Sequence, residues 1–74
     1  MKYIDRPYKN LRATMTVAGL DTAGLAEKLS MSYTTLTFKL RKKTPWTIDD
    51  MQAVQKVVNE ATGNEYTLDY LFTE

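Results

Sequence analysis

Cations and hydroxyl groups gathered in one short stretch are the residues of this chain best suited to chemistry. Residues 28–48 hold five cations and no carboxylate. Four of these cations lie close together, at Lys39, Arg41, Lys42 and Lys43. The segment just before them, residues 33–37, carries four hydroxyl side chains among its five residues. Because cations neutralise phosphates and hydroxyls hydrogen-bond to phosphates or base edges, the stretch is typical of a nucleic-acid-binding surface.

The elements that would position these groups are two short helices joined by a sharp turn. Residues 22–29 and residues 33–41 each place their apolar side chains on one face at helical spacing, with only three residues between them. The apolar positions are Leu25, Ala26, Leu29, Leu36 and Leu40. This pattern predicts a helix-turn-helix, whose second helix carries the hydroxyls and precedes the cations.

The charge of the chain is strongly divided, although its net value is only +1. Residues 49–74 carry six acids and a single cation, Lys56. A basic run by itself is about as often an ordinary solvated face as a binding surface. Its coincidence with the predicted helix-turn-helix is what favours DNA as the partner.

Length and composition exclude most other classes of function. The chain is expected to form one domain over residues 1–74, too small for a deep substrate cleft, and it contains no Cys and no His. We therefore expect no metal site, no cofactor, no small-molecule ligand and no enzyme activity. The lack of Cys, of a signal peptide and of an apolar run of about 20 residues predicts a cytoplasmic protein that does not enter a membrane.

Five short helices are expected in all. The segment from Asp5 to Pro7 predicts the start of the first helix, Gly19 its end, and Gly63 the end of the fourth. Capping residues predicted for the other four helices are Asp21, Ser32, Thr47 and Thr67. The buried stripe expected along the fourth helix is Ile48, Met51, Val54, Val57 and Val58. A closing turn over residues 68–72 is expected to pack on the core.

Three segments resemble a known family. LAEKLSMS in the second helix and turn, TLTFKLRKKTPWT in the third helix and loop, and TLDYLF in the closing turn are similar to the matching segments of lambda-repressor-like domains, the Cro/CI (Xre) family. The similarity covers nearly the whole chain. It implies an all-α, compact five-helix domain and a sequence-specific transcriptional regulator, a repressor of phage or prophage origin. Such a protein docks its third helix in the major groove of double-stranded DNA, usually as a homodimer on a palindromic operator.

Helix geometry and the resemblance agree on which side chains would read bases. With Leu36 at the centre of the buried face, Thr34 and Phe38 fall on the opposite side of the third helix. The family reads bases mainly from the first, second and sixth positions of this helix, and threonines flank these positions here. The predicted base-reading residues are Tyr33, Thr34, Thr35, Thr37 and Phe38. The alternatives are a packing role for Tyr33 and a core position for Phe38, which the periodicity disfavours.

Phosphate contacts are predicted from charge and hydroxyl groups around the same helix. The expected residues are Thr22, Lys39, Arg41, Lys42, Lys43, Thr44 and Thr47. Trp46 is interpreted instead as a plug packed under the fourth helix, with its indole N–H turned outward.

Two features depart from the family. No Gln, Asn or Arg lies within residues 33–37, so no side chain there can contact a base edge bidentately, and we expect modest direct readout. Ser30 and Lys42 stand where the family commonly has Gly. If the family's backbone is kept there, both residues take positive φ, at a cost of about 1–2 kcal/mol each. Otherwise the loop after the third helix is reshaped.

A second function remains open from the sequence. The same fold can serve as a protein-interaction module, such as an antirepressor or an inhibitor of a host protein, with Phe38 as an exposed apolar contact. The acid-free group of cations around the third helix favours DNA over this alternative.

Candidate contacts for the expected homodimer are Tyr66, Tyr70 and Phe72, together with the exposed side of the fourth helix.

Overall fold

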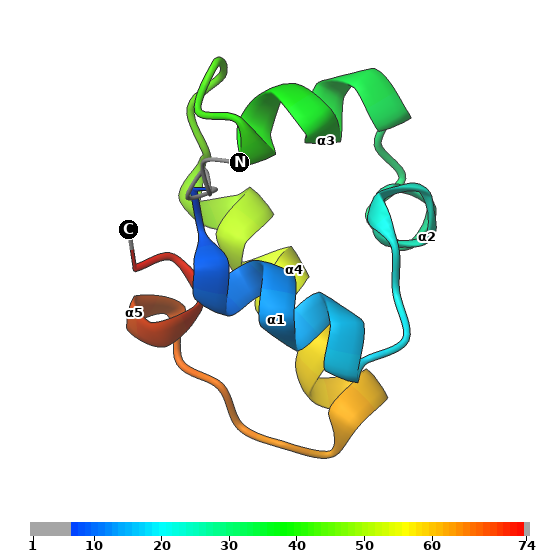
Figure 1. The fold of residues 1–74 in the computed structure, drawn as a ribbon, viewed down its shortest axis with the longest axis vertical. Coiled ribbons are helices and arrows are strands. Elements are labelled where there is room, and N and C mark those ends of the chain that lie inside the picture. Colours follow the sequence, from blue (N-terminus) through cyan, green and yellow to red (C-terminus); the bar gives the residue numbers. More distant parts are fainter. Residues whose placement is uncertain (1–6, 74) are drawn as a thin grey trace, which may run out of the picture.

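The chain folds into five helices arranged around one small core (Figure 1). The structure is a computed structural model that describes residues 7–73, and it contains no strand within them. The helices are α1 (Lys9–Val17), α2 (Thr22–Lys28), α3 (Tyr33–Leu40), α4 (Ile48–Thr62) and α5 (Leu68–Leu71). The all-α, five-helix architecture expected from the sequence is confirmed at this level. No helix of the described residues is long and apolar enough to cross a membrane.

The four helices after α1 begin at the capping residues that the sequence predicts. At each start a side-chain oxygen accepts a hydrogen bond from the backbone N–H three residues further on, which satisfies a donor that the helix itself leaves unpaired. The pairs are Asp21 with Gly24, Ser32 with Thr35, Thr47 with Asp50, and Thr67 with Tyr70. Local side-chain chemistry therefore determines where these helices begin.

The first helix starts differently from the prediction. Its N-cap is Tyr8, which has left-handed backbone angles (φ 59) and makes no side-chain cap. Tyr8 is 7% exposed, and its ring lies edge-on to Trp46 and Phe72. Burial of the ring offsets the unfavourable backbone. The predicted cap Asp5 lies outside the described residues.

Three of the helices end in the same hydrogen-bonded turn. In this Schellman motif the residue after the C-cap takes a left-handed conformation and its N–H, with that of the next residue, bonds back to the last turn of the helix. The left-handed residue is Gly19 after α1, Ser30 after α2 and Lys42 after α3, with φ of 74, 57 and 63. The positive φ that the family's backbone would require at Ser30 and Lys42 is thus observed. Gly63 ends α4 at φ 72, as predicted.

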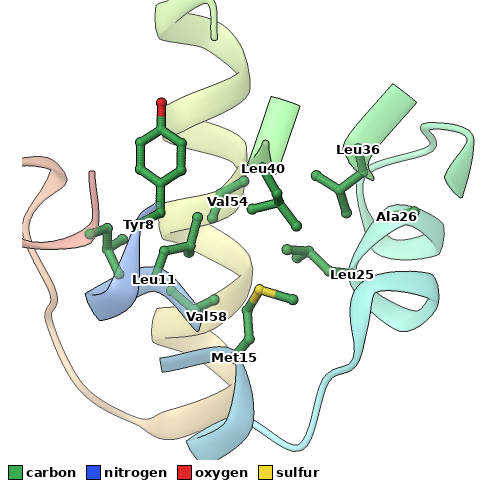
Figure 2. Packing of buried hydrophobic residues seen from close by; sticks show 10 residues of the cluster. Tyr8, Leu11, Met15, Leu25, Ala26, Leu36, Leu40, Val54 and Val58 are labelled. Carbon is green, nitrogen blue, oxygen red and sulfur yellow. The ribbon is translucent and has the colours of Figure 1, made fainter. Parts of the chain in front are cut away.

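The core forms where the apolar faces of the first four helices meet (Figure 2). Leu11, Leu25, Leu36, Val54 and Val58 are completely buried there, and Leu71 of α5 is buried with them. The predicted stripe on α4 is wrong at Ile48, which is 58% exposed, and Met51 and Val57 are half-buried instead of buried. Ile48 is the first residue of α4 and lies beyond the edge of this core. Packing of α2 and α3 on the core leaves the outer side of α3 at one end of the molecule (Figure 1).

Candidate nucleic-acid interface

The two sides of α3 differ as the helical spacing predicts. Leu36 and Leu40 are 0% and 2% exposed and face the core. Tyr33 and Phe38 are 59% and 43% exposed, and Thr34 is exposed with them. Two exposed aromatic rings on one helix offer apolar contact area to a partner. We define the outer face of α3 as the exposed residues Tyr33, Thr34 and Phe38. Thr34 and Phe38 lie opposite Leu36, whereas Tyr33 is exposed at the start of the helix, about 60° round from Leu36.

The other two threonines predicted to read bases are engaged differently. Thr35 is exposed, but its Oγ1 accepts a hydrogen bond from Ser32 Oγ at 2.8 Å within the helix cap. Thr37 is half-buried, and its Oγ1 is buried without a hydrogen bond to any described residue. A buried hydroxyl cannot reach a base edge, so we remove Thr37 from the predicted base-reading set. Thr35 stays in the predicted set, because it is exposed and a hydroxyl that accepts a hydrogen bond still has its own proton to donate.

The basic loop, residues 41–44, continues directly from α3. Arg41, Lys42 and Lys43 are all exposed. The loop has a fixed backbone, because the N–H of Lys42 donates to Lys39 O at 3.1 Å and that of Lys43 donates to Phe38 O at 2.9 Å. The ammonium of Lys42 lies 5.6 Å from the centre of the Tyr8 ring, a favourable cation–π distance. Three exposed cations thus follow α3 on a defined turn, and the ammonium of Lys42 lies over Tyr8.

The environment of Lys39 differs from that predicted for a phosphate contact. It was expected to contact phosphate, but its side chain is only 8% exposed and its Nζ lies 3.1 Å from Asp50 Oδ2. The same ammonium donates to Pro45 O at 2.9 Å and lies 5.8 Å from the centre of the Trp46 ring. We therefore remove Lys39 from the phosphate-binding set. Its position three residues after Leu36 places it towards the buried side of α3, a signal present in the sequence.

The pairing with Lys39 lowers the pKa of Asp50. The hydrogen bond from Lys39 is the main reason that the pKa of Asp50 lies below its usual value, outweighing the opposing effect of burial. The carboxylate is consequently ionised at neutral pH. Its charge offsets that of Lys39 instead of opposing the cations of the basic loop.

Trp46 is a packing residue, as predicted, but its indole is oriented differently. The ring lies 4.9 Å from Phe72 and 6.2 Å from Tyr8, in edge-on contacts. Its Nε1 is buried and makes no hydrogen bond to a described residue, so the prediction of an outward N–H is wrong. Burial of the ring in this aromatic cluster encloses Nε1 as well. Phe72 is half-buried in the same aromatic cluster.

Three threonines were also predicted to contact phosphate, one at the start of α2 and two in or just after the basic loop. Thr22 is the first residue of α2 and is half-buried, as is Thr44 in the basic loop. Thr47 is exposed, and its Oγ1 accepts the cap hydrogen bond from Asp50 at 3.1 Å. An accepting hydroxyl still has its own proton to donate, so capping does not prevent Thr47 from contacting an anion.

No group of three or more His, Cys, Asp or Glu side chains among residues 7–73 is placed to hold a metal ion. Comparison with known proteins finds no family model, no curated protein and no solved structure that matches the chain. The functional interpretation therefore depends on the geometry of α3 and the basic loop.

Proposed function

We propose that this protein is a sequence-specific regulator that binds double-stranded DNA through a helix-turn-helix formed by α2 and α3. In this proposal the five-helix domain is of the lambda-repressor-like kind, and α3 is the recognition helix in the major groove. The observation that carries the proposal is that the exposed residues of α3 are followed directly in the chain by a basic loop of three exposed cations. Both features are required by a helix that must enter a groove bordered by phosphates.

Phosphate contacts would come from the basic loop and its neighbours. Arg41, Lys42 and Lys43 supply charge, whereas Thr44 and Thr47 add hydroxyl donors. Thr22, at the start of α2, would reach the backbone on the other side of α3. These contacts fix the position of the domain on the duplex without discriminating between sequences.

Base contacts would come from the outer face of α3. The Thr34 hydroxyl and the Tyr33 phenol can each form single hydrogen bonds to base edges, and the Phe38 ring suits the C5-methyl group of thymine. No forked side chain lies on this face, so each position should contribute near the low end of the roughly 1–3 kcal/mol that a good bidentate contact provides. Sequence-dependent DNA shape would then add to the readout.

Substitutions on α3 should separate specificity from affinity. Phe38→Ala and Thr34→Ala are expected to lower the ratio of affinities for a selected duplex and for random DNA, by roughly fivefold at Phe38 if its contact contributes about 1 kcal/mol. Lys43→Ala should weaken binding to both duplexes alike, because a phosphate contact is indifferent to sequence. The preferred duplex is first selected from a random pool, and titrations then give both affinities for each variant.

Thermal unfolding of each variant supplies the control for this experiment. A folded Phe38→Ala protein whose affinity ratio equals that of the wild type would show that Phe38 does not read bases. Exposed aromatic rings on a folded protein that does not bind DNA would instead favour the protein-interaction function, for which the 59% and 43% exposure of Tyr33 and Phe38 is the supporting observation.

We also expect two copies to bind one palindromic duplex as a homodimer. A single domain of this kind buries about 600–1,000 Å² on DNA, and two half-sites one helical turn apart increase discrimination. Tyr70 is the stronger candidate contact, since it is 43% exposed and stacks on Tyr66 at 5.5 Å, whereas Phe72 is half-buried between Tyr8 and Trp46. Sedimentation analysis with a palindromic duplex should show two protein copies per DNA, and a strict one-to-one complex would contradict the proposal.

A further inference from the structure

One buried cation connects the two ends of the basic loop. Lys39 extends from α3 and meets Pro45, Trp46 and Asp50, all of which lie beyond the loop in the sequence. We call this set of contacts the Lys39 bridge. The chain between its two ends contains every residue of the basic loop, so the bridge closes the loop upon itself.

We propose that Lys39 is a positioning residue, which holds Arg41, Lys42 and Lys43 in place beside the outer face of α3. This inference rests on the proposed DNA-binding function. The bridge brings the start of α4 against the last turn of α3 through Asp50, whose own N–H is bound by Thr47. The loop between them cannot swing away while these contacts persist.

The surroundings of the ammonium explain why it would act in this way and not on phosphate. An ammonium has three donors. One is directed to Pro45 O at 2.9 Å and another to Asp50 Oδ2 at 3.1 Å, while the Trp46 ring lies alongside at 5.8 Å. A cation paired with a carboxylate inside the domain displaces no counterion from DNA, because the pair is neutral before and after binding.

Trp46 gives the bridge a rigid anchor. Its ring is fixed by edge-on contacts with Tyr8 and Phe72, two residues at opposite ends of the described chain. The loop is therefore tied through Lys39 to the aromatic cluster and not to a mobile surface group. On the α3 side, the N–H of Lys43 is held by Phe38 O at 2.9 Å, so disturbance of the bridge is transmitted to the backbone beside the outer face.

The salt dependence of DNA binding distinguishes a positioning residue from a phosphate contact. Lys39→Met keeps much of the side-chain length and removes the charge, and Lys43→Met makes the same change at an exposed cation. Both variants are titrated with a short duplex of mixed sequence at several salt concentrations. Lys43→Met should reduce the slope of log affinity against log salt by about 0.9 per protein copy. Lys39→Met should weaken binding severalfold and leave the slope as in the wild type, and Lys39→Met combined with Asp50→Asn, in which no unpaired carboxylate can repel DNA, should do the same.

Two results of this titration would overturn the inference. A Lys39→Met slope reduced as much as that of Lys43→Met would make Lys39 a direct phosphate contact. An unchanged affinity would show that the bridge does not position the loop. If Lys39→Met does not fold, Asp50→Asn provides the second variant: release of a phosphate-binding lysine would steepen the slope and tighten binding, whereas a loosened loop should bind more weakly.

Amide hydrogen exchange in the free protein tests the bridge without DNA. In Lys39→Met, the Lys43 amide should exchange faster than in the wild type, while amides in the middle of α1 keep their protection. Faster exchange in a protein that fails to bind DNA would leave the positioning intact and refute the proposed function. Unchanged exchange of Lys43 in a protein that binds DNA would refute the positioning alone.

Discussion

Leu36→Ala is expected to lower the free energy of unfolding by about 3 kcal/mol, and Phe38→Ala by less than about 1 kcal/mol. Leu36 is completely buried between α2 and the rest of the core, so truncation leaves a cavity as well as removing apolar contacts. Phe38 is 43% exposed and leaves no enclosed space. A domain of this size has only a few kcal/mol of stability, and Leu36→Ala should therefore leave a large fraction of the protein unfolded.

Urea or thermal unfolding followed by helical circular dichroism measures both changes. Thr34→Ala, on the same side of α3 as Phe38, serves as the matched control and should lie close to the wild type. Equal losses for Leu36→Ala and Phe38→Ala would mean that Phe38 belongs to the core. The outer face of α3 would then lose the residue on which its apolar base contact depends.

Arg41→Gln combined with Lys43→Gln should weaken binding to duplex DNA by well over tenfold at low salt. Each cation that neutralises a phosphate adds about 0.9 to the salt slope, so the double variant should lose about 1.8 per protein copy. Both side chains are exposed in the basic loop, and their replacement leaves the Lys39 bridge in place. Titrations over a range of salt concentrations measure affinity and slope together.

Lys56→Gln is the control for this experiment. Lys56 is an exposed cation on α4, outside the predicted binding surface. Its removal should leave the salt slope unchanged. A similar loss of slope in Lys56→Gln and in the double variant would indicate that the whole surface attracts DNA without a defined site.

Local chemistry explains why the helix boundaries could be predicted well. A cap at Asp21, Ser32, Thr47 or Thr67 needs only a side-chain oxygen and the N–H three residues on, both present in the same short segment. Positive φ at Ser30 and Lys42 was one of two alternatives that the family resemblance left open, and the structure shows it, with bonds from each turn to the last turn of its helix. The predicted start of the first helix was wrong because the N-cap, Tyr8, is held by ring contacts with distant residues and not by a neighbouring cap.

The predictions for the site were wrong where a side chain is bound or buried by residues of another segment. Lys39 was grouped with its neighbours by charge, yet its ammonium is bound by Pro45 and Asp50, a choice that depends on how α4 packs beside α3. Trp46 Nε1 is buried for the same kind of reason. The exposure of Thr34 and Phe38 could be predicted because it requires only the helical period and the position of Leu36. The exposure of Tyr33, three residues before Leu36, does not follow from that period.

The salt dependence of wild-type binding to a double-stranded DNA of mixed sequence tests the DNA-binding proposal most directly. With Arg41, Lys42 and Lys43 on phosphates, log affinity should fall against log salt with a slope of about −2.7 per protein copy, and more steeply for a dimer. Binding that is absent at low salt, or an affinity that stays flat from low to moderate salt, would contradict the assignment of the basic loop and α3 to DNA.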